Sequence, residues 1–180
     1  MFIIRGAPAP DASLPNQEGN TITLSHVWSE RPCILLFLRH LGCTFCRKHV
    51  NEMQQVYPEV RALGGAVLAV APAAPPQTAE FHRRLELSFM CFSEPEREKY
   101  RAYGLERGNL AQVAGPQLWW AGFRSVMEHG IGLPQGDTLQ LHGTFVIARG
   151  GTVEYAHRGA NSADLPTTAA VLAELRKLTQ

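Results

Sequence analysis

The sequence has very little net charge, no long apolar run and no internal repeat. Its 17 basic and 16 acidic residues give a formal net charge of +1 at pH 7, so no global field would attract nucleic acid or a membrane surface. A bilayer-spanning helix needs about 20 apolar residues in succession, and no run in the chain approaches that length. The expected partners therefore include neither nucleic acid nor a membrane.

Cysteine is also scarce. The chain of 180 residues has four cysteines, and a domain of this size can bury a full core without disulfides. Two of the four form a Cys-x-x-Cys pair, which favours catalysis in a reducing compartment over a structural role. Arg5 follows only a very short apolar start, the reverse of a secretory signal. We expect a single domain over residues 1–180, located in the cytoplasm.

The chain is organised around the Cys-x-x-Cys stretch, residues 38–49. An apolar run at 33–38 precedes the pair, Gly42 provides a turn, and a long periodic segment follows. This order predicts a buried strand and a helix whose first turn carries Cys43 and Cys46. The free N–H groups of a helix start favour a thiolate, which is the nucleophilic form of cysteine. Three nearby cations would add to that bias: Arg39, Arg47 and Lys48.

Strand-like and helix-like patterns alternate along the rest of the chain. This alternation predicts an α/β fold with a mixed sheet, because the last two strands form a hairpin around Gly150-Gly151. An N-terminal arm at 6–20 precedes it, and a Gly-rich insertion at about 107–136, with one short helix near 117–127, interrupts it before the C-terminal hairpin. The expected strands are 33–38, 66–70, 89–92, 141–148 and 152–157, and the expected helices begin near 44, 75, 93 and 164.

Four local signals predict helix boundaries or interruptions. Ser25 is expected to cap a short helical turn, and Asp164 to cap the last helix. Pro58 is expected to kink or interrupt the long helix after the cysteines, because proline lacks the N–H that the helix needs. A helix start is also expected at 93–96.

Several motifs together resemble the peroxiredoxin-like AhpC/TSA branch of the thioredoxin superfamily. The arm at 6–11 is similar to the peroxiredoxin N-terminal arm, and 42–44 is similar to the turn that presents the peroxidatic cysteine. Residues 93–95 and 100–105 match the third strand's end and the next helix, and 142–147 matches the late hairpin. The resemblance implies a thioredoxin-like fold, a central mixed sheet flanked by helices, over nearly the whole chain except 107–136.

The chain departs from the family pattern at two polar positions. Peroxiredoxins carry Thr or Ser three residues before the attacking cysteine, where this chain has His40, and an Arg in the late hairpin, where it has His142. Thioredoxins instead carry a cis-proline before the hairpin threonine, where this chain has Gly143 before Thr144. The pattern is typical of a divergent Cys-x-x-Cys subfamily.

The resemblance implies roles for the candidate site residues. Cys43 would attack peroxide and form a sulfenic acid, and Cys46 would resolve it as a disulfide; the alternatives are an inert turn cysteine and a core cysteine. His40, His142 and Thr144 complete the candidate set. No cofactor is expected, the partners being a peroxide and an external thiol such as thioredoxin, glutaredoxin or a small thiol. A homodimer is left open.

Other chemistry-bearing residues have simpler interpretations. His40, Cys43, Cys46 and His49 recur every third residue, but zinc needs ligands that converge from two segments, so no metal is expected. His49 is expected to be a solvated helix residue. Cys33 and Cys91 are expected in the core, and Trp119 and Trp120 in a pocket, a dimer surface or a small satellite core.

The sequence thus predicts a thiol-dependent peroxidase that reduces hydrogen peroxide or an organic hydroperoxide. One alternative is a thiol–disulfide oxidoreductase without peroxidase activity. The other is a redox-sensing or partner-binding module.

Overall fold

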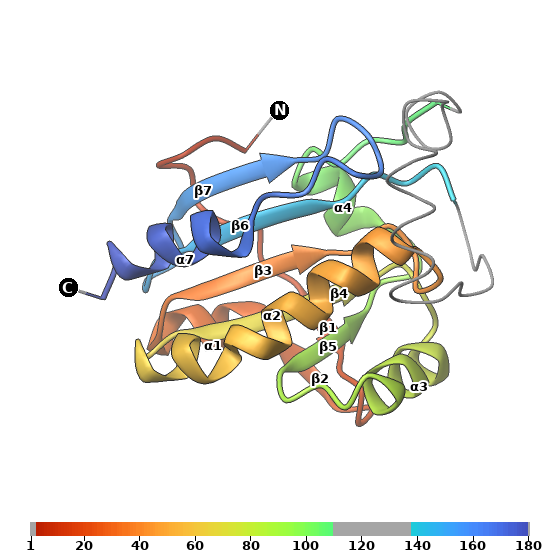
Figure 1. Ribbon diagram of the computed structural model, residues 1–180, viewed down its shortest axis with the longest axis horizontal. Helices are drawn as coiled ribbons and strands as arrows, with labels where there is room; N and C mark the ends of the chain where they lie inside the picture. The colour runs from red at the N-terminus through yellow and green to blue at the C-terminus, as the bar shows by residue number, and fades with distance from the viewer. Residues whose placement is uncertain (1–2, 110–137, 180) are drawn as a thin grey trace.

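A five-stranded mixed sheet forms the centre of the computed structural model, which describes residues 3–109 and 138–179 (Figure 1). The strand order is β5-β4-β3-β6-β7, with β3, β4 and β5 parallel and β6 antiparallel to both neighbours. The elements are β1 (Ser13–Pro15), β2 (Thr21–Thr23), α1 (Leu24–Glu30), β3 (Cys33–Phe37), α2 (Thr44–Ala62), β4 (Ala66–Ala71), α3 (Pro75–Arg84), β5 (Met90–Ser93), α4 (Glu98–Ala102), β6 (Gly143–Ile147), β7 (Val153–Arg158) and α7 (Thr168–Arg176).

Alternation of side chains along β3 creates one hydrophobic core on each face of the sheet. Ile34 and Leu36 face the core that α2 and α7 cover, whereas Leu35 and Phe37 face the core shared with α1 and α4. All five residues of β3 are buried, as expected for a central strand covered on both faces. The predicted α/β architecture with a thioredoxin-like sheet is confirmed.

The carboxyl ends of the parallel strands lie at one end of the sheet, and the two thiols lie there. Phe37 ends β3, and Cys43 follows it as the N-terminal cap of α2. Arg107 and Gln140 form an antiparallel bridge at this end, so the chain departs and returns at neighbouring points. The predicted insertion between them, with its short helix and its two tryptophans, lies outside the described residues except at 107–109.

Helix α2 continues through Pro58, so the predicted interruption is wrong, and the alternative, a kink, stays a prediction. Pro58 is exposed, and the carbonyl that it leaves without an intrahelical donor lies four residues earlier, at Gln54. The helix ends at Ala62, two residues before Gly64, whose φ of +73° is easily adopted by glycine.

Two predicted caps are also wrong: Ser25 lies inside α1, and the side chain of Asp164 has another partner. The Ser25 N–H is capped by Asp11 Oδ1 at 2.9 Å, and α1 starts one residue earlier. Helix α7 is capped by Thr167, whose Oγ1 accepts from Ala170 N at 3.2 Å. Asp164 instead accepts from Ala160 N at 2.8 Å in the preceding loop.

Helix α4 is shorter than predicted. The helix-start signal at 93–96 is realised as a turn, and Glu94 Oε1 accepts from Glu98 N at 2.9 Å. Among the described residues, no helix is long and apolar enough to cross a membrane.

Candidate active site

The backbone between β3 and α2 fixes the two thiols at the helix start. Cys43 N donates to His40 O at 3.1 Å, which closes a turn. Cys43 Sγ then accepts from Cys46 N at 3.5 Å, and Cys46 Sγ accepts from Arg39 N at 3.4 Å. Both thiols are buried and are not joined by a disulfide. Their separation of one helical turn is compatible with a bridge between them.

A buried guanidinium lies against the Cys43 thiol. Arg39 is 3% exposed, and its Nη1 donates to Cys43 Sγ at 3.5 Å. Its Nε donates to Gln140 O at 2.9 Å and its Nη2 to Thr138 O at 2.6 Å. The two carbonyls hold the guanidinium in one orientation, so its charge faces the sulfur without further reorganisation.

These contacts separate the two thiols in acidity. A hydrogen bond from the thiol of Cys46 lowers the pKa of Cys43 to about 6; burial opposes this shift, and the charge of Arg39 supports it. The same hydrogen bond, seen from the other partner, raises the pKa of Cys46 well above its usual range. Cys43 is therefore the thiolate at neutral pH, and Cys46 keeps the proton. This asymmetry is consistent with the predicted roles of Cys43 as nucleophile and Cys46 as second thiol, which stay predictions.

We expect limiting iodoacetamide at pH 6.5 to alkylate Cys43 before the other cysteines. Burial raises the pKa of Cys33 and of Cys91 to about 12, so their thiolate fractions at this pH are negligible. Peptide mass mapping after brief labelling checks the order. Labelling of Cys46 ahead of Cys43 would reverse the assigned roles.

His40 lies beside the thiols in a buried position. Its Nδ1 is buried without a hydrogen-bond partner. Burial, with the charge of Arg39 as a second cause, lowers the pKa of His40 to about 4. A neutral imidazole at this position has one N–H donor and one acceptor nitrogen. Its role as a partner of the thiolate remains a prediction.

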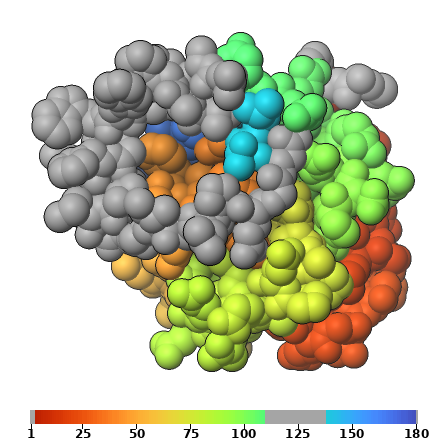
Figure 2. Space-filling view, turned by 90° about the vertical axis from the view of Figure 1, so that its right-hand side faces the viewer, coloured from red at the N-terminus to blue at the C-terminus, as the bar shows by residue number. Residues whose placement is uncertain are grey.

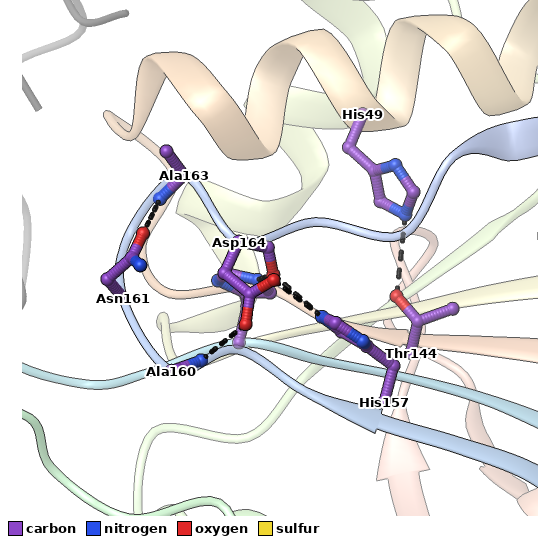
Figure 3. Close-up of polar contacts among 8 residues, drawn as sticks. His49, Thr144, His157, Ala160, Asn161, Ala163 and Asp164 are labelled. Atoms are coloured by element: carbon purple, nitrogen blue, oxygen red, sulfur yellow. Dashed lines mark hydrogen bonds and ion pairs between the residues drawn. The ribbon is translucent and has the colours of Figure 1, made fainter.

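His49 is buried against Thr144, so the predicted solvated position is wrong. His49 is 3% exposed, and its Nε2 lies 3.4 Å from Thr144 Oγ1 on β6 (Figure 3). Burial lowers the pKa of His49 to about 4. His49 follows Cys46 by one turn on the buried side of α2, which places Thr144 behind the thiol pair. No contact of Thr144 with either sulfur is seen among the described residues.

His142 has a partner in the loop after β7. Its Nε2 and that of His157 each lie 2.7 Å from the carbonyl oxygen of Asp164. Since both nitrogens must donate to one carbonyl, both rings carry the Nε2 proton. Gly159 packs against the His142 ring, and a Cβ there would lie 2.4 Å from it. His142 thus holds the loop to the sheet, and its predicted role at Cys43 remains a prediction.

The other residues considered for the site lie in an ion pair on α2 or in the two hydrophobic cores. Lys48 pairs with Glu52 at 3.8 Å on the partly exposed side of α2. Cys33 and Cys91 are buried in the two cores, as expected. The described residues contain no group of three or more side chains arranged to hold a metal ion.

The sequence pattern missed Tyr100 and understated Arg39. The Tyr100 hydroxyl lies 2.8 Å from both Leu38 O and Val70 O, so it ties the ends of β3 and β4 together just before the thiol turn. The available signal was the place of Tyr100 in the 100–105 motif, which gives no role to its hydroxyl. Arg39 was one of three candidate cations, and only the fold shows that it is the one facing the sulfur.

Figure 2 shows the face of the molecule on which the thiol turn lies. Residues around 40–48, in orange, lie beside those around 138–141, in cyan, which are followed by the green of residues around 100–109. The thiol turn is therefore bordered by segments distant from it in sequence.

The fold and the site together define a class, the thioredoxin-superfamily proteins that act through a redox cysteine pair, either as thiol peroxidases or as thiol–disulfide oxidoreductases. The chain belongs to the AhpC/TSA family, whose model matches residues 5–156.

Similar proteins agree with this assignment. Peroxiredoxin-like 2C from Mus musculus is 25% identical over 179 residues, covering 89% of this chain and 77% of the relative. The crystal structure of peroxidoxin BcpB from Mycobacterium tuberculosis has a TM-score of 0.74 at 18% identity, covering 99% of this chain and 100% of that one. The crystal structure of a Chlorobium tepidum protein assigned as a thiol:disulfide interchange protein DsbE has a TM-score of 0.66 at 23% identity, covering 96% of this chain and 99% of that one. The two structures support the fold.

Proposed function

We propose that the protein is a thiol-dependent peroxidase whose nucleophile is Cys43. The Cys43 thiolate attacks one oxygen of ROOH, the O–O bond breaks, and the departing RO⁻ takes a proton and leaves as ROH. Cys43 is thereby oxidised to the sulfenic acid. The Cys46 sulfur then attacks the Cys43 sulfur, water leaves with the Cys46 proton, and the pair is oxidised to a disulfide.

The observation that carries the proposal is the set of donors around the Cys43 sulfur. The Cys46 N–H and the Arg39 guanidinium both point to it at 3.5 Å. Preset donors of this kind stabilise the thiolate and the charge that develops on a departing oxygen. Membership of the AhpC/TSA family supports the same chemistry.

An external thiol completes the proposed cycle. Two thiol equivalents reduce the Cys43–Cys46 disulfide and are themselves oxidised to a disulfide, so no bound cofactor takes part. Thioredoxin, glutaredoxin or a small thiol would serve as the reductant. The reduced cysteines that this cycle needs fit a reducing cytoplasm.

Peroxide treatment is expected to join Cys43 to Cys46 within one chain. The treated protein should lose two thiols and yield a linked peptide that contains both residues, as mass spectrometry can show. In Cys46→Ser, Cys43 should pass through sulfenic acid to higher acids, because no resolving thiol is present. Cys91→Ser serves as the matched control and should still form the bridge. A bridge from Cys43 to Cys91, or to a second chain, would rule out the pairing.

The second candidate function is thiol–disulfide exchange without peroxide. The observation that favours it is the pair of buried thiols one helical turn apart, of which Cys43 has a lowered pKa and Cys46 a raised one, as exchange requires. Stopped-flow oxidation by hydrogen peroxide, run beside an insulin-disulfide reduction assay, separates the two. Fast insulin reduction with no peroxide reaction would establish exchange in place of peroxidase activity.

A further inference from the structure

One peptide group connects the Tyr100 hydroxyl with the second thiol. The Tyr100 hydroxyl donates to Leu38 O at 2.8 Å. The N–H of the same peptide unit belongs to Arg39, and it donates to Cys46 Sγ at 3.4 Å. The hydroxyl also lies 2.8 Å from Val70 O, but that carbonyl has a second donor, Leu38 N at 2.9 Å. The hydroxyl proton is therefore needed most at Leu38 O, on the opposite side of the peptide from the sulfur.

This series of two hydrogen bonds is shielded from water. Tyr100 is fully buried, and Cys46 and Arg39 are 2% and 3% exposed. Hydrogen bonds in series polarise one another, and each is stronger in a low dielectric. Donation to the carbonyl thus makes the peptide N–H a stronger donor to the sulfur. Burial raises the pKa of Tyr100 well above its usual range, and the charge of Cys46 is the second cause, so the hydroxyl keeps its proton and the two ends interact electrostatically.

The second thiol needs a strong donor because it must lose a proton. Its hydrogen bond with Cys43 and its burial raise the pKa of Cys46 well above its usual range, and the hydrogen bond from Arg39 N acts in the opposite direction. In the closure step the Cys46 sulfur attacks the sulfur of the Cys43 sulfenic acid, the S–O bond breaks, and water leaves with the Cys46 proton. Negative charge develops on the Cys46 sulfur as its proton departs, and the Arg39 N–H already points at that sulfur.

We propose that Tyr100 is a positioning residue for Cys46: its hydroxyl holds and polarises the Leu38–Arg39 peptide, which stabilises the charge on the attacking sulfur. This role rests on the proposed function, in which Cys46 closes the disulfide. It does not extend to Cys43, because the guanidinium that faces Cys43 is held by two other carbonyls. Loss of the hydroxyl is therefore expected to affect one of the two chemical steps and to spare the other.

Tyr100→Phe removes the hydroxyl and keeps the ring. One equivalent of hydrogen peroxide is mixed with the reduced protein, and mass spectrometry of quenched samples follows first the Cys43 sulfenic acid and then the disulfide. Formation of the sulfenic acid should stay within about twofold of the parent, whereas closure should slow about fivefold, the usual effect of one hydrogen bond. The pH at which closure becomes fast should move upward, because the Cys46 thiolate is less stabilised.

Tyr103→Phe is the matched control. Tyr103 is also fully buried, and its ring, like that of Tyr100, packs against Phe37. Its hydroxyl donates to Pro10 O at 3.0 Å, in the N-terminal arm, so this variant should close the disulfide at the rate of the parent. If thermal melting shows that Tyr100→Phe is unfolded, 3-fluorotyrosine at position 100 is measured instead. Its hydroxyl is a stronger donor, so closure should then be faster than in the parent.

The outcomes separate the role of Tyr100 from the proposed reaction. Closure of Tyr100→Phe at the parent's rate overturns the role, and so does equal slowing of both steps or equal slowing in Tyr103→Phe, since loosened packing alone would give either. If the parent does not react with peroxide, diamide is the oxidant: it forms an S–N adduct with Cys43, and Cys46 displaces the hydrazine to close the disulfide. Slower closure of Tyr100→Phe with diamide would keep the role and refute the peroxidase.

Discussion

Replacing Arg39 by glutamine is expected to slow the reaction of Cys43 with hydrogen peroxide about a hundredfold or more, the usual cost of removing one preset donor from a developing charge. The change removes the charge and the Nη1 contact at 3.5 Å from the sulfur. It should also raise the pKa of Cys43 above about 6, because the Arg39 charge helps to lower it. Stopped-flow rates from pH 5 to pH 9 give both quantities.

Lys48→Gln is the matched control for this experiment. It removes one positive charge from the same segment, but Lys48 is partly exposed and pairs with Glu52. Its rate should stay within about twofold of the parent, since exposed charges are screened by water and salt. Arg39→Lys should keep part of the pKa effect and lose the fixed orientation. An Arg39→Gln variant that is folded and reacts like the parent would show that the guanidinium is structural only.

The sequence was informative wherever the signal is local. Residues 33–38 form an unbroken apolar run, which allows little except a buried strand, and the observed β3 ends at Phe37. The two cysteines follow it directly, so their position at a helix start could be predicted from a few neighbouring residues. The hairpin around Gly150-Gly151 was equally local, because both glycines have positive φ.

The features that the sequence could not provide depend on partners far along the chain. His49 is three residues from Cys46, but its burial depends on Thr144, 95 residues away. Arg39 differs from Lys48 in role because the carbonyls of Thr138 and Gln140 hold it, about a hundred residues later. No periodicity in a single helix or strand encodes such contacts.

The predicted cap at Asp164 failed for the same physical reason. A carboxylate before a helix is a good cap in isolation. Here, however, the Asp164 side chain accepts from Ala160 N, and its backbone carbonyl accepts from two histidines. Thr167, three residues later, is the residue whose side chain reaches the first turn of α7. The contacts of Asp164 O with His142 and His157 hold this loop against the sheet, and α7 begins only after the loop.

Three buried histidines should make the fold sensitive to acid. Burial is the main reason that the pKa values of His40, His49 and His142 lie at about 4, below the ordinary value of 6.5. Between these values the unfolded chain binds a proton that the folded chain does not, so stability rises with pH there. The contribution is complete above pH 6.5 and is lost as pH falls through about 4. A shift of this size corresponds to about 3 kcal/mol for each histidine, against a total of about 5–15 kcal/mol for a domain.

Urea unfolding at pH 4.5, 5.5, 6.5 and 7.5 measures this loss. The free energy of unfolding should decrease by about 1.4 kcal/mol per pH unit for each of the three histidines as the pH falls below 6.5. In His49→Gln and in His142→Gln the slope of the free energy of unfolding against pH should fall by about 1.4 kcal/mol per pH unit, which corresponds to one proton. Glutamine keeps a hydrogen-bond donor but does not titrate in this range. His26→Gln, at an exposed position on α1, removes a surface histidine and is the control. If the slope is unchanged in both buried variants, the acid sensitivity has another origin, and the two histidines are charged or solvated in the folded protein.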